Sequence, residues 1–266
     1  MLLNYDRIGK LAWVLTAIGI AVALYLLLPI VLIVALSFGS SQWLQFPPPA
    51  WTLRWYEELL GDPAWLQSFW TSLLVALTVM VLSVVLGLLA SFGLVRGAFS
   101  GRQALRAFFL TPMILPVVIL AVALYAMFLR VGLAGTFVGF VLAHLVLALP
   151  FSIISIGNSL ERFDRSVEDA AVICGAHPLE AKLRVTLPAI RLGVLAAALF
   201  SFLASWDEVV VAIFMASPTL QTLPVRIWGS MRQDLSPVIA AASSLLVLIT
   251  TAMMMVGALV RRGVRA

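Results

Sequence analysis

The sequence carries little charge for its length. Charged residues make up 11% of the 266 residues and hydrophobic residues make up 63%. A soluble globular chain is about half apolar and about a quarter charged. The composition therefore excludes an ordinary soluble domain, because this much apolar surface needs a non-aqueous solvent.

Cysteine, histidine and lysine are also scarce. The single cysteine, Cys174, excludes an intrachain disulfide, and with the nearby His177 it supplies too few ligands for zinc. A phosphate-binding loop needs Gly-Lys followed by Ser or Thr. Lys10 is followed by leucine, and Lys182 has no glycine before it. Gly-x-Ser-x-Gly and His-Glu-x-x-His are also missing, so we expect no enzyme activity, no metal and no cofactor bound by this chain.

Long apolar runs are what the chain has instead. A membrane-spanning helix needs about 20 mostly apolar residues. Six runs are long enough, and we predict an all-α integral membrane protein with six transmembrane helices: Leu11–Phe38, Phe69–Val95, Ala107–Leu129, Leu133–Ile156, Leu192–Met215 and Val238–Val260. The first run is too long for a secretory signal, so we read it as an uncleaved span.

Lysine and arginine predict the orientation, because they gather in cytoplasmic loops. Thirteen of the 17 lie at the termini, in the turn 96–106 or in the segment 157–191. The other four are Arg54, Arg130, Arg226 and Arg232. Six spans with both termini in the cytoplasm satisfy this count, and they leave an external segment, 39–68, rich in tryptophan and proline. We divide the chain into a first span with its external segment (1–66), a membrane core (67–260) and a basic cytoplasmic tail (261–266).

The loop 159–191 is the longest cytoplasmic connection, and its residues encode two short helices with a sharp bend. Ser166 and the acids after it have the form of a capping box that begins a helix. Gly175 supplies the left-handed backbone that ends one. Pro178 suits the first turn of the next helix, and Pro188 is expected to end it.

The same loop resembles a known motif. Asp169-Ala170-Ala171, three residues, Gly175, nine residues and then Val185-Thr186-Leu187-Pro188 is similar to the EAA motif of ABC importer permeases, with Asp for Glu and Val for Ile. Further segments resemble the second permease of spermidine/putrescine-type importers: Pro112–Pro116, Ala148–Phe151, Ser205–Glu208 and Leu223–Ile227.

This resemblance implies a type I (MetI-like) permease fold in the bacterial inner membrane, with the bent loop as a coupling helix that docks in a groove of a cytoplasmic ATPase. ATP and magnesium would be bound by that ATPase. The implied partners are a second permease, which is needed to enclose the path, two ATPase copies and a periplasmic solute-binding protein; we expect no nucleic acid. The expected coupling residues are Glu168, Asp169, Ala170, Ala171, Gly175, Leu187 and Pro188.

Two acids, Asp207 and Glu208, lie inside the fifth apolar run beside Trp206. A charge at the centre of a membrane helix costs about 2.5–3.5 kcal/mol on insertion scales, so such residues usually face a protein interior or an aqueous cavity. One reading is a substrate path that attracts a cation such as a polyamine, with Asp207 favoured over Glu208. The other is an internal hydrogen bond to another span or to the partner permease.

Other transport classes stay open from the residues alone. The same machinery is compatible with another amine, a phosphonate or ferric ion as cargo. A self-sufficient secondary transporter often shows paired internal repeats with broken helices, which the sequence does not display. An intramembrane enzyme would need a nucleophile and a base close together. Copurification of an ATPase would distinguish the importer from both.

Overall fold

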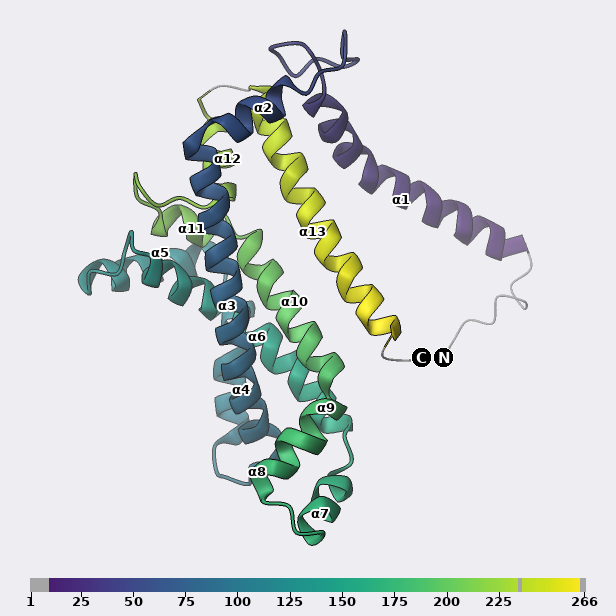
Figure 1. Cartoon of the computed structure of the whole chain (residues 1–266), viewed down its shortest axis with the longest axis vertical. Helices are drawn as coiled ribbons and strands as arrows, with labels where there is room; N and C mark the ends of the chain where they lie inside the picture. Colours follow the sequence, from purple (N-terminus) through teal and green to yellow (C-terminus); the bar gives the residue numbers. More distant parts are fainter. Residues whose placement is uncertain (1–9, 234–235, 264–266) are drawn as a thin grey trace. The chain divides into compact units, whose positions relative to one another are not determined.

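The computed structural model describes residues 10–233 and 236–263, and apart from two isolated β-bridges their regular secondary structure is helical (Figure 1). This confirms the all-α prediction. Arg7 and the last residues of the basic tail, 264–266, lie outside the described residues. The chain forms two compact units, residues 1–62 with 230–248 and residues 63–229 with 249–266, and each is described by itself.

The first unit contains α1 (Lys10–Ser37) and α2 (Arg54–Gly61). The segment between them folds back on the end of α1. Trp55 Nε1 donates to the carbonyl of Gly39 at 2.6 Å, and the Tyr56 hydroxyl lies 2.7 Å from Ser37 Oγ. The Trp- and Pro-rich segment is therefore an ordered structure, and Trp43, Phe46 and Trp51 on it stay exposed.

The second unit is built around three long helices, α3 (Pro63–Arg96), α6 (Phe137–Arg162) and α10 (Arg191–Trp206). Small polar residues join them: Ser152 Oγ lies 2.7 Å from Ser201 Oγ, and Ser91 Oγ donates to the Ile153 carbonyl at 3.3 Å. Small residues let membrane helices approach closely, and their hydroxyls add hydrogen bonds between helices. The three helices therefore form a tightly packed bundle.

The third predicted span is not one straight helix. It is divided into α4 (Arg102–Leu110), a 3-10 turn (Thr111–Met113) and α5 (Val117–Arg130), with a bend of 101° between the two halves. Pro116 precedes α5 directly. A proline lacks the N–H that would continue the ladder, and its ring disfavours helical backbone in the residue before it.

The fifth predicted span is broken as well. Helix α10 ends at Trp206 and α11 (Val210–Met215) begins after a non-helical stretch, so the two acids lie in the break and not inside a helix as predicted. The remaining helices are α12 (Leu223–Met231) and α13 (Pro237–Gly263). The first turn of α12 is buried.

Among the described residues, four helices are long and apolar enough to cross a membrane, and there are six candidate spans if each bent helix pair counts as one. The second bent pair is the segment Pro178–Ala189 with Arg191–Trp206, at 73°. The prediction of six spans is confirmed in this form.

Candidate functional site

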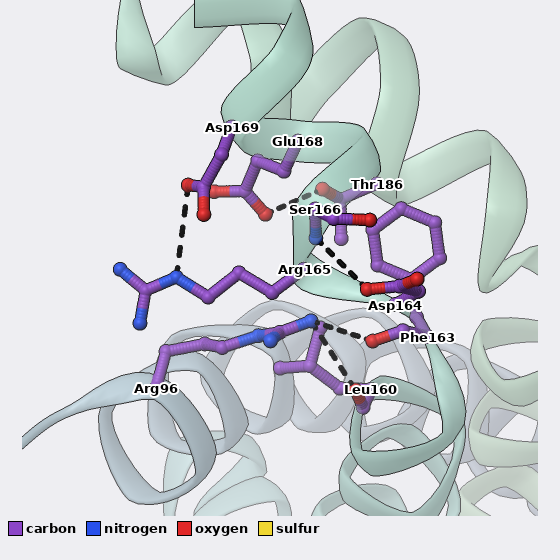
Figure 2. A network of polar contacts seen from close by, with 9 residues as sticks. All are labelled: Arg96, Leu160, Phe163, Asp164, Arg165, Ser166, Glu168, Asp169 and Thr186. Carbon is purple, nitrogen blue, oxygen red and sulfur yellow. Dashed lines mark hydrogen bonds and ion pairs between the residues drawn. The ribbon is translucent and has the colours of Figure 1, made fainter.

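The loop after α6 begins with a cap that the sequence reading misplaced. Helix α7 (Arg165–Ile173) starts one residue after Asp164, whose carboxylate accepts the backbone N–H of Ser166 at 2.9 Å (Figure 2). This hydrogen bond, with one from the Ser166 side chain, lowers the pKa of Asp164 below its usual range. Ser166 is therefore the second residue of the helix and not its cap, because Asp is an equally good cap and lies where the chain leaves α6.

The end of α7 is as predicted. Gly175 has a φ of +101°, and its N–H donates to the Val172 carbonyl at 3.0 Å. The N–H of Ala176 donates to the Ala171 carbonyl at 3.1 Å. This pair of bonds is the Schellman motif, in which a left-handed residue ends a helix and reverses the chain.

The second half of the loop is a continuous helical path that changes type. It runs through α8 (Pro178–Ala181), a π-helical turn (Lys182–Thr186) and α9 (Leu187–Ala189) before α10. Pro178 lies in the first turn, as predicted, whereas helical backbone continues one residue past Pro188. π-Turns inside helices are rare overall, and those that occur often lie at functional sites.

The two adjacent acids of α7 point in different directions (Figure 2). Glu168 accepts a hydrogen bond of 2.7 Å from the hydroxyl of Thr186, which is completely buried. Asp169 is exposed and pairs with Arg165, one turn earlier, across 3.7 Å. Glu168 is thus committed to a contact inside the loop, and Asp169 is available to a partner.

The other predicted coupling residues divide between surface and interior. Ala170 and Pro188 are exposed and Ala171 is half-buried. Leu187 packs against the buried cluster of Ile156 and Ile190.

The sequence reading missed an apolar surface on this loop. Ile173 is 86% exposed, and Leu179 and Val167 are also exposed. None of the residues of α7 is buried. The sequence contained a signal for this surface, namely an apolar stretch in a segment that is too short to bury its own apolar side chains. Exposed apolar patches rimmed by polar residues mark interaction sites.

Arg96, the last residue of α3, joins this loop from the side (Figure 2). One of its terminal nitrogens donates to the carbonyls of Leu160, at 3.4 Å, and Phe163, at 3.1 Å. Its guanidinium also lies 6.0 Å from the centre of the Phe163 ring. A cation at these carbonyls is favourable because the C-terminal end of α6 carries partial negative charge.

The acids in the break between α10 and α11 have separate surroundings. Glu208 accepts the N–H of Val211 at 2.7 Å and so begins α11. Asp207 is exposed in this chain and accepts a hydrogen bond of 3.4 Å from Thr250 on α13. Trp206 is 1% exposed, and the centre of its ring lies 5.6 Å from that of Phe202, on which it stacks. The Trp206 ring therefore does not reach the surface where Asp207 lies.

His144 on α6 is completely buried, and its Nδ1 lies 2.8 Å from Ser205 Oγ on α10. This hydrogen bond joins α6 to α10. Within the described residues, no group of three or more histidine, cysteine, aspartate or glutamate side chains is placed to hold a metal ion.

A multi-pass bundle with broken helices is typical of membrane transport proteins. Residues 83–265 match the profile of the family described as binding-protein-dependent transport system inner membrane component, and the chain belongs to that family. It is therefore a multi-pass membrane protein with the type I permease fold.

The curated relatives include polyamine permeases. The chain is 32% identical to the putrescine transport system permease protein PotI of Escherichia coli over 82% of this chain and 79% of that protein. It is 29% identical to the spermidine/putrescine transport system permease protein PotC of Haemophilus influenzae over 90% of this chain and 92% of that protein.

Solved structures show the same fold at lower identity. A bacterial ABC transporter involved in the import of the acidic polysaccharide alginate superimposes with a TM-score of 0.72 and 17% identity, covering 98% of both chains. A bacterial alginate ABC transporter in complex with an alginate pentasaccharide-bound periplasmic protein superimposes with a TM-score of 0.68 and 14% sequence identity, covering 96% of this chain and 95% of that one.

Proposed function

We propose that this chain passes a small cationic solute of the polyamine class, such as putrescine or spermidine, from a periplasmic binding protein across the inner membrane, driven by a separate ATPase. The observation that carries the proposal is the similarity to the putrescine and spermidine/putrescine permeases over at least 82% of this chain. The fold alone does not select this cargo, because a protein of the same fold takes part in importing an acidic polysaccharide.

The ATPase partner docks on the loop 159–191. The support is the combination of exposed Ile173, Leu179 and Ala170 with the exposed carboxylate of Asp169. An amphipathic helix that leaves its apolar side chains uncovered fits a groove on a partner. ATP and magnesium belong to that partner. In this arrangement the loop and both termini face the cytoplasm, and the Trp- and Pro-rich segment 39–68 faces the periplasm, as the distribution of arginine indicates.

Asp207 is the residue we assign to the cationic solute. Its carboxylate is exposed on this chain, whereas that of Glu208 is engaged with the backbone of α11. An exposed acid in a broken membrane span faces a cavity or a partner and not lipid. A second permease, different from this chain, encloses the rest of the path.

Another amine, a phosphonate or ferric ion remains the alternative cargo for the same machinery. A phosphonate is anionic and would be repelled by Asp207. Family membership favours the importer over a self-sufficient secondary transporter.

The test is uptake by the purified transporter in proteoliposomes with its binding protein and internal ATP. Labelled putrescine and spermidine should enter, and a phosphonate or ferric citrate should not. Asp207→Asn should reduce polyamine uptake about tenfold or more, because a charge-assisted contact is lost, while the ATPase still copurifies. Glu57→Gln removes an exposed carboxylate on α2, outside the broken span and the loop 159–191, and is the matched control. Uptake without ATP, or full uptake by Asp207→Asn, would contradict the proposal.

A further inference from the structure

Two half-buried polar contacts tie the loop that carries α7 to the rest of the bundle. At its start, Arg96 of α3 binds the carbonyls of Leu160 and Phe163. On its far side, Glu168 binds the hydroxyl of Thr186, just before α9 and α10. The first contact joins α3 to the end of α6, and the second joins α7 to the π-helical turn before α9.

The Arg96 contact is directed at the connection between α6 and α7. Phe163 is the residue between these helices, apart from the cap Asp164, and its ring packs against the buried cluster that contains Leu160 and Ile156. The positive charge of Arg96 also favours the ionised form of the Asp164 carboxylate. Arg96 therefore holds the backbone of the connection through which a movement of α7 would reach α6.

The Glu168 contact joins the two arms of the loop. Thr186 has no exposed surface and ends the π-helical turn, and Glu168 comes from α7, 18 residues earlier. A hydrogen bond between a carboxylate and a buried hydroxyl is stronger than one between neutral groups. A push on α7 is thereby transmitted to α9 and α10 by side chains as well as by the chain itself.

We propose that Arg96 and Glu168 are positioning residues for coupling: Arg96 holds the connection between α6 and α7 to α3, and Glu168 holds α7 to the turn before α9 and α10. Movement of the loop by the ATPase would then move these helices with it. The inference rests on the proposed function. It assigns Glu168 to the interior of the loop and leaves Asp169 to face the partner. Loss of either contact should leave ATP hydrolysis running with less solute moved for each ATP.

The experiment measures uptake and ATP hydrolysis together in proteoliposomes that contain the purified transporter, its binding protein and putrescine. The quantity compared is putrescine moved per ATP hydrolysed. Thr186→Val keeps the shape of the side chain but removes the donor, and Thr186→Ser keeps the donor. Glu168→Ala removes the acceptor, and Glu168→Gln keeps it. Arg96→Gln removes the charge, and Arg96→Lys keeps it.

We expect Thr186→Val, Glu168→Ala and Arg96→Gln each to lower the ratio roughly tenfold, the size expected when a hydrogen bond to a charged group is lost. The conservative variants Thr186→Ser, Glu168→Gln and Arg96→Lys should recover most of it. The double variant Glu168→Ala/Thr186→Val should be no worse than either single variant, because both remove one contact. The control Glu57→Gln, on α2 and outside the loop, should match the wild-type ratio.

The outcomes distinguish a failure of the proposed function from a failure of the positioning role. A wild-type complex in which neither the binding protein nor putrescine stimulates ATP hydrolysis would contradict the proposed function. A wild-type complex that couples normally, with unchanged ratios in Thr186→Val and Arg96→Gln, would overturn the positioning role alone. So would a Thr186→Val or Arg96→Gln protein that no longer assembles with the ATPase, because the contact would then maintain the fold and not the coupling.

Discussion

Gly193→Ala provides a direct test of how closely α6 and α10 pack. A Cβ atom on Gly193 would lie 2.5 Å from the Cβ of Ser159 and 2.9 Å from the backbone carbonyl oxygen of Ser155, with the Ser159 hydroxyl closer still. Carbon atoms in good contact are about 3.5–4.0 Å apart. The helices would have to separate by about 1 Å, because a backbone oxygen cannot turn away as a side chain can.

Two opposing effects set the size of the change. Overpacking of this kind costs about 1–3 kcal/mol. Replacing glycine by alanine inside a helix returns up to about 1 kcal/mol through helix propensity. The added Cβ would lie within 3 Å of three atoms, which places the overpacking cost in the upper part of its range, so Gly193→Ala should destabilise the bundle by roughly 1–2 kcal/mol. Gly93→Ala in α3 is the matched control, because nothing lies within 4 Å of its added Cβ and only the favourable effect remains.

The assay is the thermal midpoint of the purified transporter complex in one detergent, followed by tryptophan fluorescence. Gly193→Ala should melt below the wild type, and Gly93→Ala at or above it. Adding Ser159→Ala to Gly193→Ala should recover only part of the loss, since the Ser155 carbonyl and the Cβ of residue 159 remain. A Gly193→Ala complex as stable as Gly93→Ala would refute the close packing of α6 and α10 described here.

Two further predictions concern α7. Gly175→Ala should cost about 1–2 kcal/mol of local stability, because a left-handed backbone is unfavourable for a residue with a Cβ, and Gly175→Asn should cost less. Copurification of the ATPase and hydrogen exchange of α7 would measure the difference. Equal behaviour of the two variants would contradict the prediction. Because the pKa of Asp164 is lowered in the folded loop, its cap stabilises α7 above the ordinary carboxyl pKa and is lost as the pH falls through the lowered value. Exchange-protection of α7, corrected for intrinsic rates, should therefore drop in acid for the wild type but not for Asp164→Asn, and parallel curves would refute the cap.

Features that depend on local backbone chemistry were predictable from the sequence. Gly175 is the example, since only its left-handed conformation matters and open space surrounds it. The beginning of α7 was not predictable in the same way. Asp164 and Ser166 are both good caps, and the choice between them depends on where α6 ends.

Contacts between distant residues explain the other differences. The break after Trp206 interrupts an apolar run that reads as one span. The break is stabilised by Glu208, whose carboxylate accepts the N–H of Val211 and caps α11. The bond from Thr186 to Glu168 spans 18 residues, the chain reversal at Gly175 and a change from α- to π-helix, which no periodic pattern encodes. The coupling and substrate residues therefore stay predictions, although their local surroundings are now defined.

The bend between α4 and α5 also bears on how the protein can exist in a bilayer. Residues 113–116 are exposed on this chain at the point where helical hydrogen bonding is interrupted. Backbone groups cannot be left without partners in hydrocarbon, so irregular backbone at membrane depth has to be covered by protein or to border water. With lipid alone around it, this bend would satisfy neither condition, so we expect a companion protein to cover residues 113–116 in the assembled transporter.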